Sequence, residues 1–321
     1  MRSTLGLVAL FALSAGFFGA PAAQAQQTAS VIRVASIPAD IAAEVLYARD
    51  LGYFKQAGIE IEVTPLPNAG AILNAVASHS VDIGFGNVIM VAEAHEKGLP
   101  LELVAPANLH LASAPNTGFL AVKTSSPIRS AKDLTGKAIA VNGTGGIVHL
   151  ATRDWIDENG GNSNDARFIE FPLAEMPALL SDGKVDAAVL DSAGYATLQQ
   201  TPNAVRLLGV TFNAVAPNFV VAGWATTKDW SAAHPDLVRK FSEVMLKTAA
   251  WANAHHSESA KILANYVKLS AEQIDRTTRV VYGTTLNAAV IQPDIDLAVK
   301  YGALKARFAA ADMMWSPKGA K

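Results

Sequence analysis

A run of small residues, Asn-Gly-Thr-Gly-Gly at 142–146, is the stretch whose composition points most directly to binding chemistry. Its three glycines lack the Cβ atoms that would keep a ligand away from the backbone amides. The run follows an apolar segment at 138–141, typical of a buried strand, and precedes apolar residues at helical spacing through 155. Amides at a helix start are unpaired and partly positive, so the run predicts an anion site. A tight turn without a ligand is the alternative.

Two ionisable side chains are the next candidates for binding chemistry. His149 lies one turn into the helix predicted after the loop, where a packed or surface histidine is more common than a ligand contact. Asp191 follows an apolar run at 185–190 and precedes Ser-Ala-Gly. It would either pair with a cationic group on a ligand or cap the next helix, and this ordinary strand-to-helix junction favours the cap.

Catalytic, cofactor and metal chemistry find little support in the sequence. The chain has no cysteine, which excludes disulfides, thiolate metal sites and cysteine nucleophiles. Position 148 is valine, so the glycine run does not match the G-x-G-x-x-G dinucleotide pattern. The serines at 36, 126 and 192 lack a G-x-S-x-G elbow, and no His-x-x-x-His pattern is present. We expect no catalytic residue, no metal, no cofactor and no enzyme activity.

The overall composition suits a folded protein with a small-molecule ligand. Half of the 321 residues are hydrophobic and 17% are charged, which allows a large core and argues against disorder. The formal net charge is -2 and no basic cluster is present, so nucleic acid and lipid surfaces are not expected partners. We expect a monomer.

Residues 1–25 have the pattern of a secretory signal peptide. Arg2 precedes an apolar run at 5–20, and Ala-Gln-Ala at 23–25 is a small-x-small cleavage site. A membrane-spanning helix is the alternative, which the short core rich in Gly and Ala disfavours. An exported chain without cysteine has neither disulfides nor a lipid anchor, so we expect it in the periplasm of a Gram-negative bacterium.

The rest of the chain contains one strand–helix pattern twice. Strands predicted at 31–36, 59–63 and 81–85, with helices between them, form a βαβαβ unit. The elements at 137–190 repeat this unit, and in both copies Val-Asp opens the third strand. The repetition predicts an α/β fold with two lobes of similar topology, each built on a parallel sheet.

Two further apolar segments, at 118–123 and 219–226, are expected to be crossover strands because they flank the second unit. The chain after them returns to the first lobe. We therefore expect residues 26–120 and 222–321 to form lobe one and residues 121–221 to form lobe two. A cleft between lobes joined in this way closes by hinge motion.

The candidate ligand contacts follow from the position of the predicted strands. In parallel α/β lobes, ligands lie outside the carboxyl ends of the strands. Segments beside the crossovers would line the wall at the hinge. The predicted ligand-binding residues are Ser36, Ile37, Pro38, Asn87, Val88, Asn108, Thr117, Asn142, Thr144, Gly145, Gly146, Asp191, Ala214 and Val215.

Several segments resemble the substrate-binding proteins of ABC importers for nitrate, sulfonates, taurine and related solutes, also called the thiamine-precursor-synthase-like family. The resemblance covers nearly all of the chain after residue 25. The segments that carry it are Leu-Gly-Tyr-Phe-Lys-Gln-Ala-Gly-Ile-Glu-Ile-Glu at 51–62, Val-Asp-Ile-Gly at 81–84, Asp-Leu-Thr-Gly-Lys at 133–137, Gly-Lys-Val-Asp-Ala at 183–187 and His-Pro-Asp-Leu-Val-Arg-Lys-Phe at 234–241.

This resemblance implies a type II-like periplasmic binding protein that captures a small anionic solute and delivers it to an ABC permease. Its ligand loops would correspond to Ser36, Asn87, Asp191 and the segment 144–146. No arginine lies at these strand ends, so an anion would rest on amides, hydroxyls and asparagine side chains. Three alternatives stay open: a receptor for a pyrimidine thiamine precursor, a synthase-like enzyme, and a solute receptor coupled to a membrane sensor.

Overall fold

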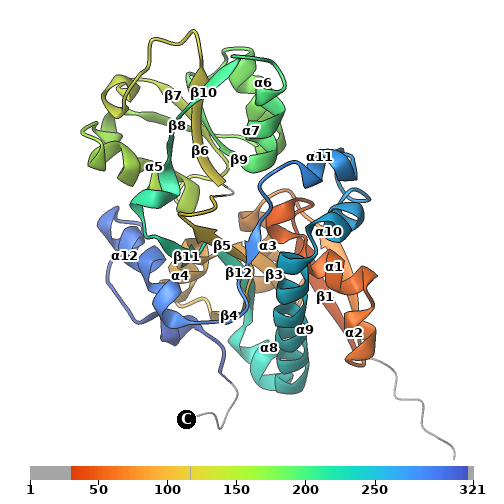
Figure 1. Ribbon diagram of the computed structural model, residues 1–321. Helices are drawn as coiled ribbons and strands as arrows, with labels where there is room; N and C mark the ends of the chain where they lie inside the picture. Colours follow the sequence, from red (N-terminus) through yellow and green to blue (C-terminus); the bar gives the residue numbers. More distant parts are fainter. Residues whose placement is uncertain (1–29, 116, 317–321) are drawn as a thin grey trace, which may run out of the picture.

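Two five-stranded sheets form the centres of two lobes in the computed structural model, which describes residues 30–115 and 117–316 (Figure 1). The predicted signal peptide lies outside these residues. The first sheet has the order β2 (Ile59–Pro65), β1 (Ser30–Ser36), β3 (Ile83–Asn87), β12 (Ala222–Thr227) and β4 (Leu101–Pro106). The second has the order β10 (Val205–Val210), β6 (Thr117–Lys123), β9 (Ala187–Asp191), β7 (Ala138–Val141) and β8 (Arg167–Glu170).

Each sheet contains the predicted parallel unit. Strand β1 pairs in parallel with β2 and β3, and β7 pairs in parallel with β8 and β9. The two-lobed α/β prediction is thereby confirmed, with one difference. Strands β12 and β6 run antiparallel to their neighbours. Each of them enters its sheet from the other lobe, so no helical crossover fixes its direction.

The repeated Val-Asp pair has the same structural role in both lobes. Asp82 accepts a hydrogen bond at Oδ2 from the backbone amide of Arg33 at 2.8 Å. Asp186 accepts the equivalent bond from the amide of Ala138, also at 2.8 Å. In each lobe the carboxylate therefore fixes the start of the third strand against the first, at the point where a buried amide would otherwise lack a partner.

A third, small sheet joins the lobes. It has the order β11 (Asn218–Val220), β5 (Asn108–Leu111) and β13 (Val281–Tyr282), all antiparallel. The crossovers expected at 118–123 and 219–226 are displaced: the first lies within β6, and the second is divided between β11 and β12. The chain crosses between the lobes just before β6 and just before β12. Apolar extended segments look alike whether they cross or join a sheet, so the pattern alone misplaced them.

Helices cover both faces of the two sheets (Figure 1). The long helix predicted from 235 to 255 is present and buries Val238, Phe241 and Met245 against the first sheet. No helix among residues 30–115 and 117–316 is both long and apolar enough to cross a bilayer. The helices of the first lobe are α1 (Glu44–Asp50), α2 (Tyr53–Gln56), α3 (Ala69–Ala77), α4 (Val88–Glu96), α8 (Lys228–Ala233), α9 (Pro235–Ala254), α10 (His256–Leu263), α11 (Ala271–Asp275) and α12 (Gln292–Lys300), and those of the second are α5 (Ile147–Glu158), α6 (Met176–Ser181) and α7 (Ser192–Gln199).

Helix α5 belongs to the second lobe but also packs against the first. Its residues Ile147 and Leu150 are buried in the same apolar cluster as Ile291 of the first lobe. Further along α5, the buried carboxylate of Asp154 pairs with Lys300 at the end of α12 and accepts a hydrogen bond from the hydroxyl of Tyr301 at 3.0 Å. The two lobes are therefore in contact along the α5–α12 flank.

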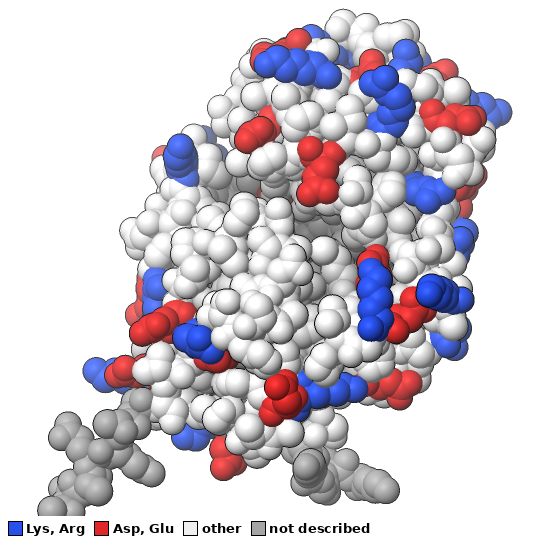
Figure 2. Space-filling view, turned by 180° about the vertical axis from the view of Figure 1, so that it is seen from behind, with Lys and Arg blue, Asp and Glu red and all other residues white. Residues whose placement is uncertain are grey.

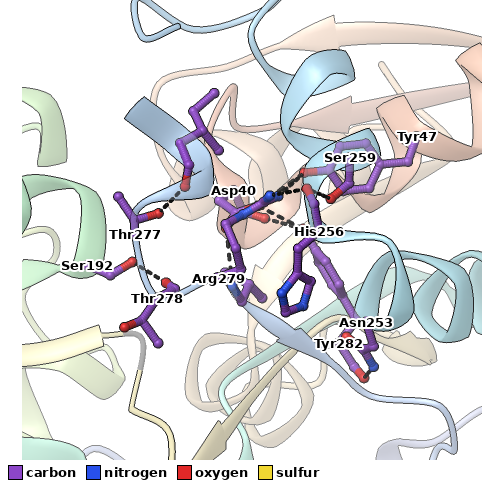
Figure 3. Close-up of polar contacts among 12 residues, drawn as sticks. Asp40, Tyr47, Ser192, Asn253, His256, Ser259, Thr277, Thr278, Arg279 and Tyr282 are labelled. Atoms are coloured by element: carbon purple, nitrogen blue, oxygen red, sulfur yellow. Dashed lines mark hydrogen bonds and ion pairs between the residues drawn. The ribbon is translucent and has the colours of Figure 1, made fainter. Parts of the chain in front are cut away.

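The opposite flank is formed by the segment between α11 and β13, which is held by a buried ion pair (Figure 3). Arg279 donates two hydrogen bonds to the carboxylate of Asp40, at 2.9 and 2.8 Å, and a third to the hydroxyl of Tyr47. From the second lobe, Ser192 donates a hydrogen bond to the carbonyl of Thr278 at 2.5 Å. The segment is thus fixed to the first lobe and meets the second through Ser192.

We predict that Asp40→Ala lowers the free energy of unfolding by about 3 kcal/mol, because it leaves the guanidinium of Arg279 buried without an anionic partner. Urea denaturation followed by circular dichroism measures the change. Asp236→Ala is the matched control, since it removes an exposed pair with Arg239 that contributes little. Equal stability of the two variants would contradict the structural role given to the Asp40–Arg279 pair.

Candidate functional site

A cavity of about 290 Å³ lies between the two lobes. Its lining comes from the ends of the parallel strands of both sheets, from the crossings and from the loops that follow β2 and β8. Seen from behind, the middle of the molecule is hollowed and mostly uncharged, with charged residues gathered above and below (Figure 2). The lining residues are Ile37, Ile41, Pro67, Asn68, Ala69, Gly70, Phe85, Asn87, Met90, Asn108, Thr117, Asn142, Gly143, Thr144, Gly146, Ile147, Val148, Glu170, Phe171, Pro172, Leu173, Val189, Phe212, Val221 and Ala222.

The cavity gathers several of the predicted ligand-binding residues. They come from strand ends in both lobes and from the segments beside the crossings, so residues far apart in the sequence meet here. The predicted residues in its lining are Ile37, Asn87, Asn108, Thr117, Asn142, Thr144 and Gly146.

The other predicted residues lie outside this lining. Ser36 is buried and donates a hydrogen bond to the carbonyl of Ala42 at 3.0 Å, Val88 is buried, and Pro38 is exposed. Gly145 is in the same loop as Gly146 but faces Glu93 of α4. Two further predicted residues, Ala214 and Val215, line a separate depression beside α5 and α12.

Asp191 caps helix α7, as the residue pattern favoured. Its Oδ1 accepts a hydrogen bond from the amide of Gly194 at 2.7 Å. Burial raises the pKa of this carboxyl, and the nearby charge of Asp40 adds to the effect. Asp191 therefore lies between the helix start and the Asp40–Arg279 pair of the other lobe.

Side chains from outside the glycine loop at 142–146 accept hydrogen bonds from two of its amides. The amide and hydroxyl of Thr144 donate to Oε2 of Glu170, at 3.1 and 3.3 Å. The amide of Gly145 donates to Nδ1 of His149 at 2.9 Å. Two of the amides expected to hold an anion are therefore already paired, and one of them is paired with a carboxylate.

His149 is held in a neutral form by this arrangement. Burial, together with the nearby charge of Arg153, lowers its pKa to about 4. Its ring meets that of Phe168 edge-on, with 4.5 Å between ring centroids. Because Nδ1 accepts from Gly145, a proton on the neutral ring belongs on Nε2. His149 thus fixes the loop conformation and does not line the cavity.

Sequence reasoning missed the cavity residues contributed by β2 and β8. Asn68 follows β2 and caps α3 with its side chain, and Glu170 ends β8. Both lie at carboxyl ends of parallel strands, so the same positional rule applied to every strand would have found them. The segment 171–173 after β8 likewise corresponds to the loop after β2 in the first lobe.

The polar groups of the cavity divide between the lobes. In the first lobe, the side-chain oxygens of Asn68 and Asn87 accept from the amides of Ala71 and Met90, which leaves their NH₂ groups as donors. In the second lobe, Glu170 is an acceptor and is the one charged residue among those that line the cavity. Phe85, Phe171 and Phe212 are also among the lining residues; Phe85 and Phe212 are buried, and Phe171 is partly exposed.

Metal ligands are not gathered here. Among the residues that the structure describes, no group of three or more His, Asp or Glu side chains is arranged to hold a metal ion. The lining, with amides, hydroxyls, aromatic rings and one carboxylate, is typical of a site for a small organic molecule.

Gly146 allows the lobes to approach closely across the cavity. A Cβ atom built on this residue would lie 2.9 Å from Nδ2 of Asn87 in the first lobe. Asn87 begins α4 and Gly146 begins α5, so two helix starts face each other. A side chain at this point of contact would require Asn87 to shift.

Comparison with known proteins agrees with this arrangement. Residues 41–259 match the family model described as NMT1/THI5 like. The riboflavin-binding protein RibY of Chloroflexus aurantiacus is 26% identical over 256 residues, which are 77% of this chain and 70% of RibY. The alkanesulfonate-binding protein SsuA of Xanthomonas axonopodis pv. citri, solved with MOPS bound, has a TM-score of 0.72 at 19% identity and covers 89% of this chain and 98% of its own.

An enzyme is also among the relatives. The 4-amino-5-hydroxymethyl-2-methylpyrimidine phosphate synthase THI13 of Saccharomyces cerevisiae is 23% identical over 241 residues, which are 72% of this chain. The match spans 66% of the synthase's own length. The similarity therefore extends to both a binding protein and a synthase.

We predict that Gly146→Ala disfavours the closed arrangement of the lobes by about 1–3 kcal/mol, because the added methyl group overpacks against Asn87. Small-angle X-ray scattering would show a larger radius of gyration than that of the wild type. Gly143→Ala is the matched control, since a Cβ there meets no atom within 4 Å. An unchanged radius for Gly146→Ala would show that the contact does not limit closure.

We also predict that His149→Asn makes stability less sensitive to acid. The pKa of His149 is about 4 in the folded chain against 6.5 for an ordinary histidine, so its contribution is complete above pH 6.5 and is lost as the pH falls towards 4. Allowing for solvent screening of this partly exposed ring, that loss is on the order of 1–2 kcal/mol. Urea denaturation at neutral and acidic pH measures it, and identical losses in variant and wild type would contradict the prediction.

Proposed function

This chain belongs to the NMT1/THI5-like family, and we propose that it is the solute-binding component of an ABC importer, acting in the periplasm after removal of residues 1–25. The observation that carries the proposal is the cavity between two lobes joined by paired crossings. A solute that contacts strand ends of both lobes stabilises the closed form over the open one. The permease would then recognise the closed form.

We place the solute among small organic molecules with an aromatic ring. The small anion expected from the sequence would depend on loop amides that Thr144 and Gly145 already use within the protein. An uncharged ring suits the mainly apolar lining, in which Phe171 is a partly exposed aromatic side chain, better. The names of RibY and THI13, which refer to a flavin and a pyrimidine, give this class of solute further support.

We propose binding rather than catalysis for this chain. The hydroxyl of Thr144 donates to Glu170, but no histidine or lysine among the described residues lines the cavity to complete a catalytic set with them. The expected lobes, residues 26–120 with 222–321 and residues 121–221, would hold except that the whole of β6 (Thr117–Lys123) belongs to the sheet of lobe two. A receptor that reports to a membrane sensor would use the same closed form, and the membrane partner would decide between import and sensing.

A panel of solutes tests the proposal. Thermal unfolding of the refolded, ligand-free protein is measured with flavins, pyrimidines, aromatic amides, alkanesulfonates, taurine and nitrate. A solute at about one hundred times its dissociation constant adds roughly 2.7 kcal/mol, which raises the melting temperature by several degrees. We expect a ring solute to give this shift and to reduce the radius of gyration.

The Gly146→Ala variant is the control for this panel, because its lobes should not close on the same solute. A shift that persists unchanged in this variant would place the solute outside the cleft. Absence of any shift or compaction across the panel would overturn the proposed receptor function. A response to nitrate or sulfonates alone would show that the ligand is an anion and would contradict the proposed ring solute.

A further inference from the structure

We propose that Glu170 selects the solute by charge: the cleft takes a ring whose edge carries N–H donors, as in an amidine, an amide or an amino-substituted heterocycle, and rejects anions. This inference rests on the proposed receptor function and specifies the ligand of that same cavity. It concerns a residue that the strand-end pattern of the sequence did not single out.

Glu170 is fixed in position before any solute arrives. Its Oε2 accepts both the amide of Thr144 at 3.1 Å and the hydroxyl of the same residue at 3.3 Å. These two bonds hold the carboxylate at the end of β8, in the lining of the cavity. Among the described residues no hydrogen bond engages Oε1, so this second oxygen is available to a donor on the solute.

The charge of Glu170 is not compensated within the cavity. No lysine, arginine or histidine is among the described residues that line it. Glu170 is exposed in the unliganded protein, so a carboxylate or sulfonate would meet its like charge, without a cationic partner in the lining, as the bound solute displaces water. A cationic or N–H-bearing group would instead donate a hydrogen bond to the negatively charged carboxylate of Glu170.

The first lobe supplies the complementary polarity. The side-chain oxygens of Asn68 and Asn87 are used as helix caps, so their NH₂ groups face a solute as donors. A solute with an acceptor atom towards the first lobe and N–H groups towards Glu170 would therefore connect the lobes.

Three probes of one shape test this inference: benzamidine, benzamide and benzoate. They share a ring and differ in the charge and donors of one group. For the wild type, titration followed by ligand-observed NMR should show binding of benzamidine and benzamide and no binding of benzoate. Glu170→Gln should weaken benzamidine by about tenfold, because a hydrogen bond to a charged group is lost. The Glu170→Gln variant should also show a smaller difference in affinity between benzamide and benzoate.

The fold should survive this substitution, since the side-chain oxygen of glutamine can still accept from Thr144. Glu175→Gln is the matched control: it removes the same charge from an exposed residue outside the cavity, so it should leave the order of the probes unchanged. Circular dichroism and the melting temperature confirm that both variants are folded.

Three results would overturn the inference: benzoate binding the wild type most tightly, an unchanged preference in Glu170→Gln, or no binding of the two N–H-bearing probes. Failure of the proposed receptor function can be distinguished from failure of this inference, because no solute of the wider panel would then change the melting temperature or the radius of gyration. A panel solute could bind and close the lobes with an affinity that does not depend on Glu170. That result would support the receptor function and contradict the proposed selection by charge.

Discussion

The antiparallel pairing of β5 with β11 is the interaction on which the rest of the arrangement depends. It places the two crossings side by side, with His110 opposite Phe219, so the lobes can rotate about one narrow connection. His110 is buried between the rings of Phe212 and Phe219 and is hydrogen-bonded to Asn213 at 3.0 Å. Burial lowers the pKa of His110 to about 4, so the connection stays uncharged at neutral pH. The strand ends of both sheets meet around this connection, which determines where the cavity lies.

Helix capping then determines the polarity of the cavity. Asparagine side chains of the first lobe direct their oxygens to the starts of α3 and α4, so only donors remain for a ligand. In the second lobe the start of α5 has no side-chain cap, and the preceding loop is satisfied by Glu170 and His149. Two amides beside a helix start that would attract an anion in isolation are thereby used within the protein itself. The same short glycine loop can therefore serve different ligand classes, depending on which side chain reaches it.

Much of the architecture could be predicted because it is recorded in local patterns. The repeated Val-Asp pair identifies equivalent strands in the two lobes, and its carboxylate makes the same bond in each. The strand-end rule places Asn87 and Asn142 in the lining. By contrast, the pairing of Thr144 with Glu170 joins residues that are separated in sequence and belong to no periodic pattern. The anchoring of Arg279 by Asp40 spans 239 positions, and such a contact has no local signal.

The unequal contacts on the two flanks of the cleft have a consequence for the route of the solute. On one flank, separation of α5 from α12 would expose apolar side chains and the buried carboxylate of Asp154. On the other, the bond from Ser192 to Thr278 is a single hydrogen bond that water can replace (Figure 3). The lobes should therefore separate more easily beside α7 and α11. We expect the solute to enter and leave the cleft on that side. The α5–α12 flank, with its larger set of contacts, would separate less as the lobes rotate about the β5–β11 connection.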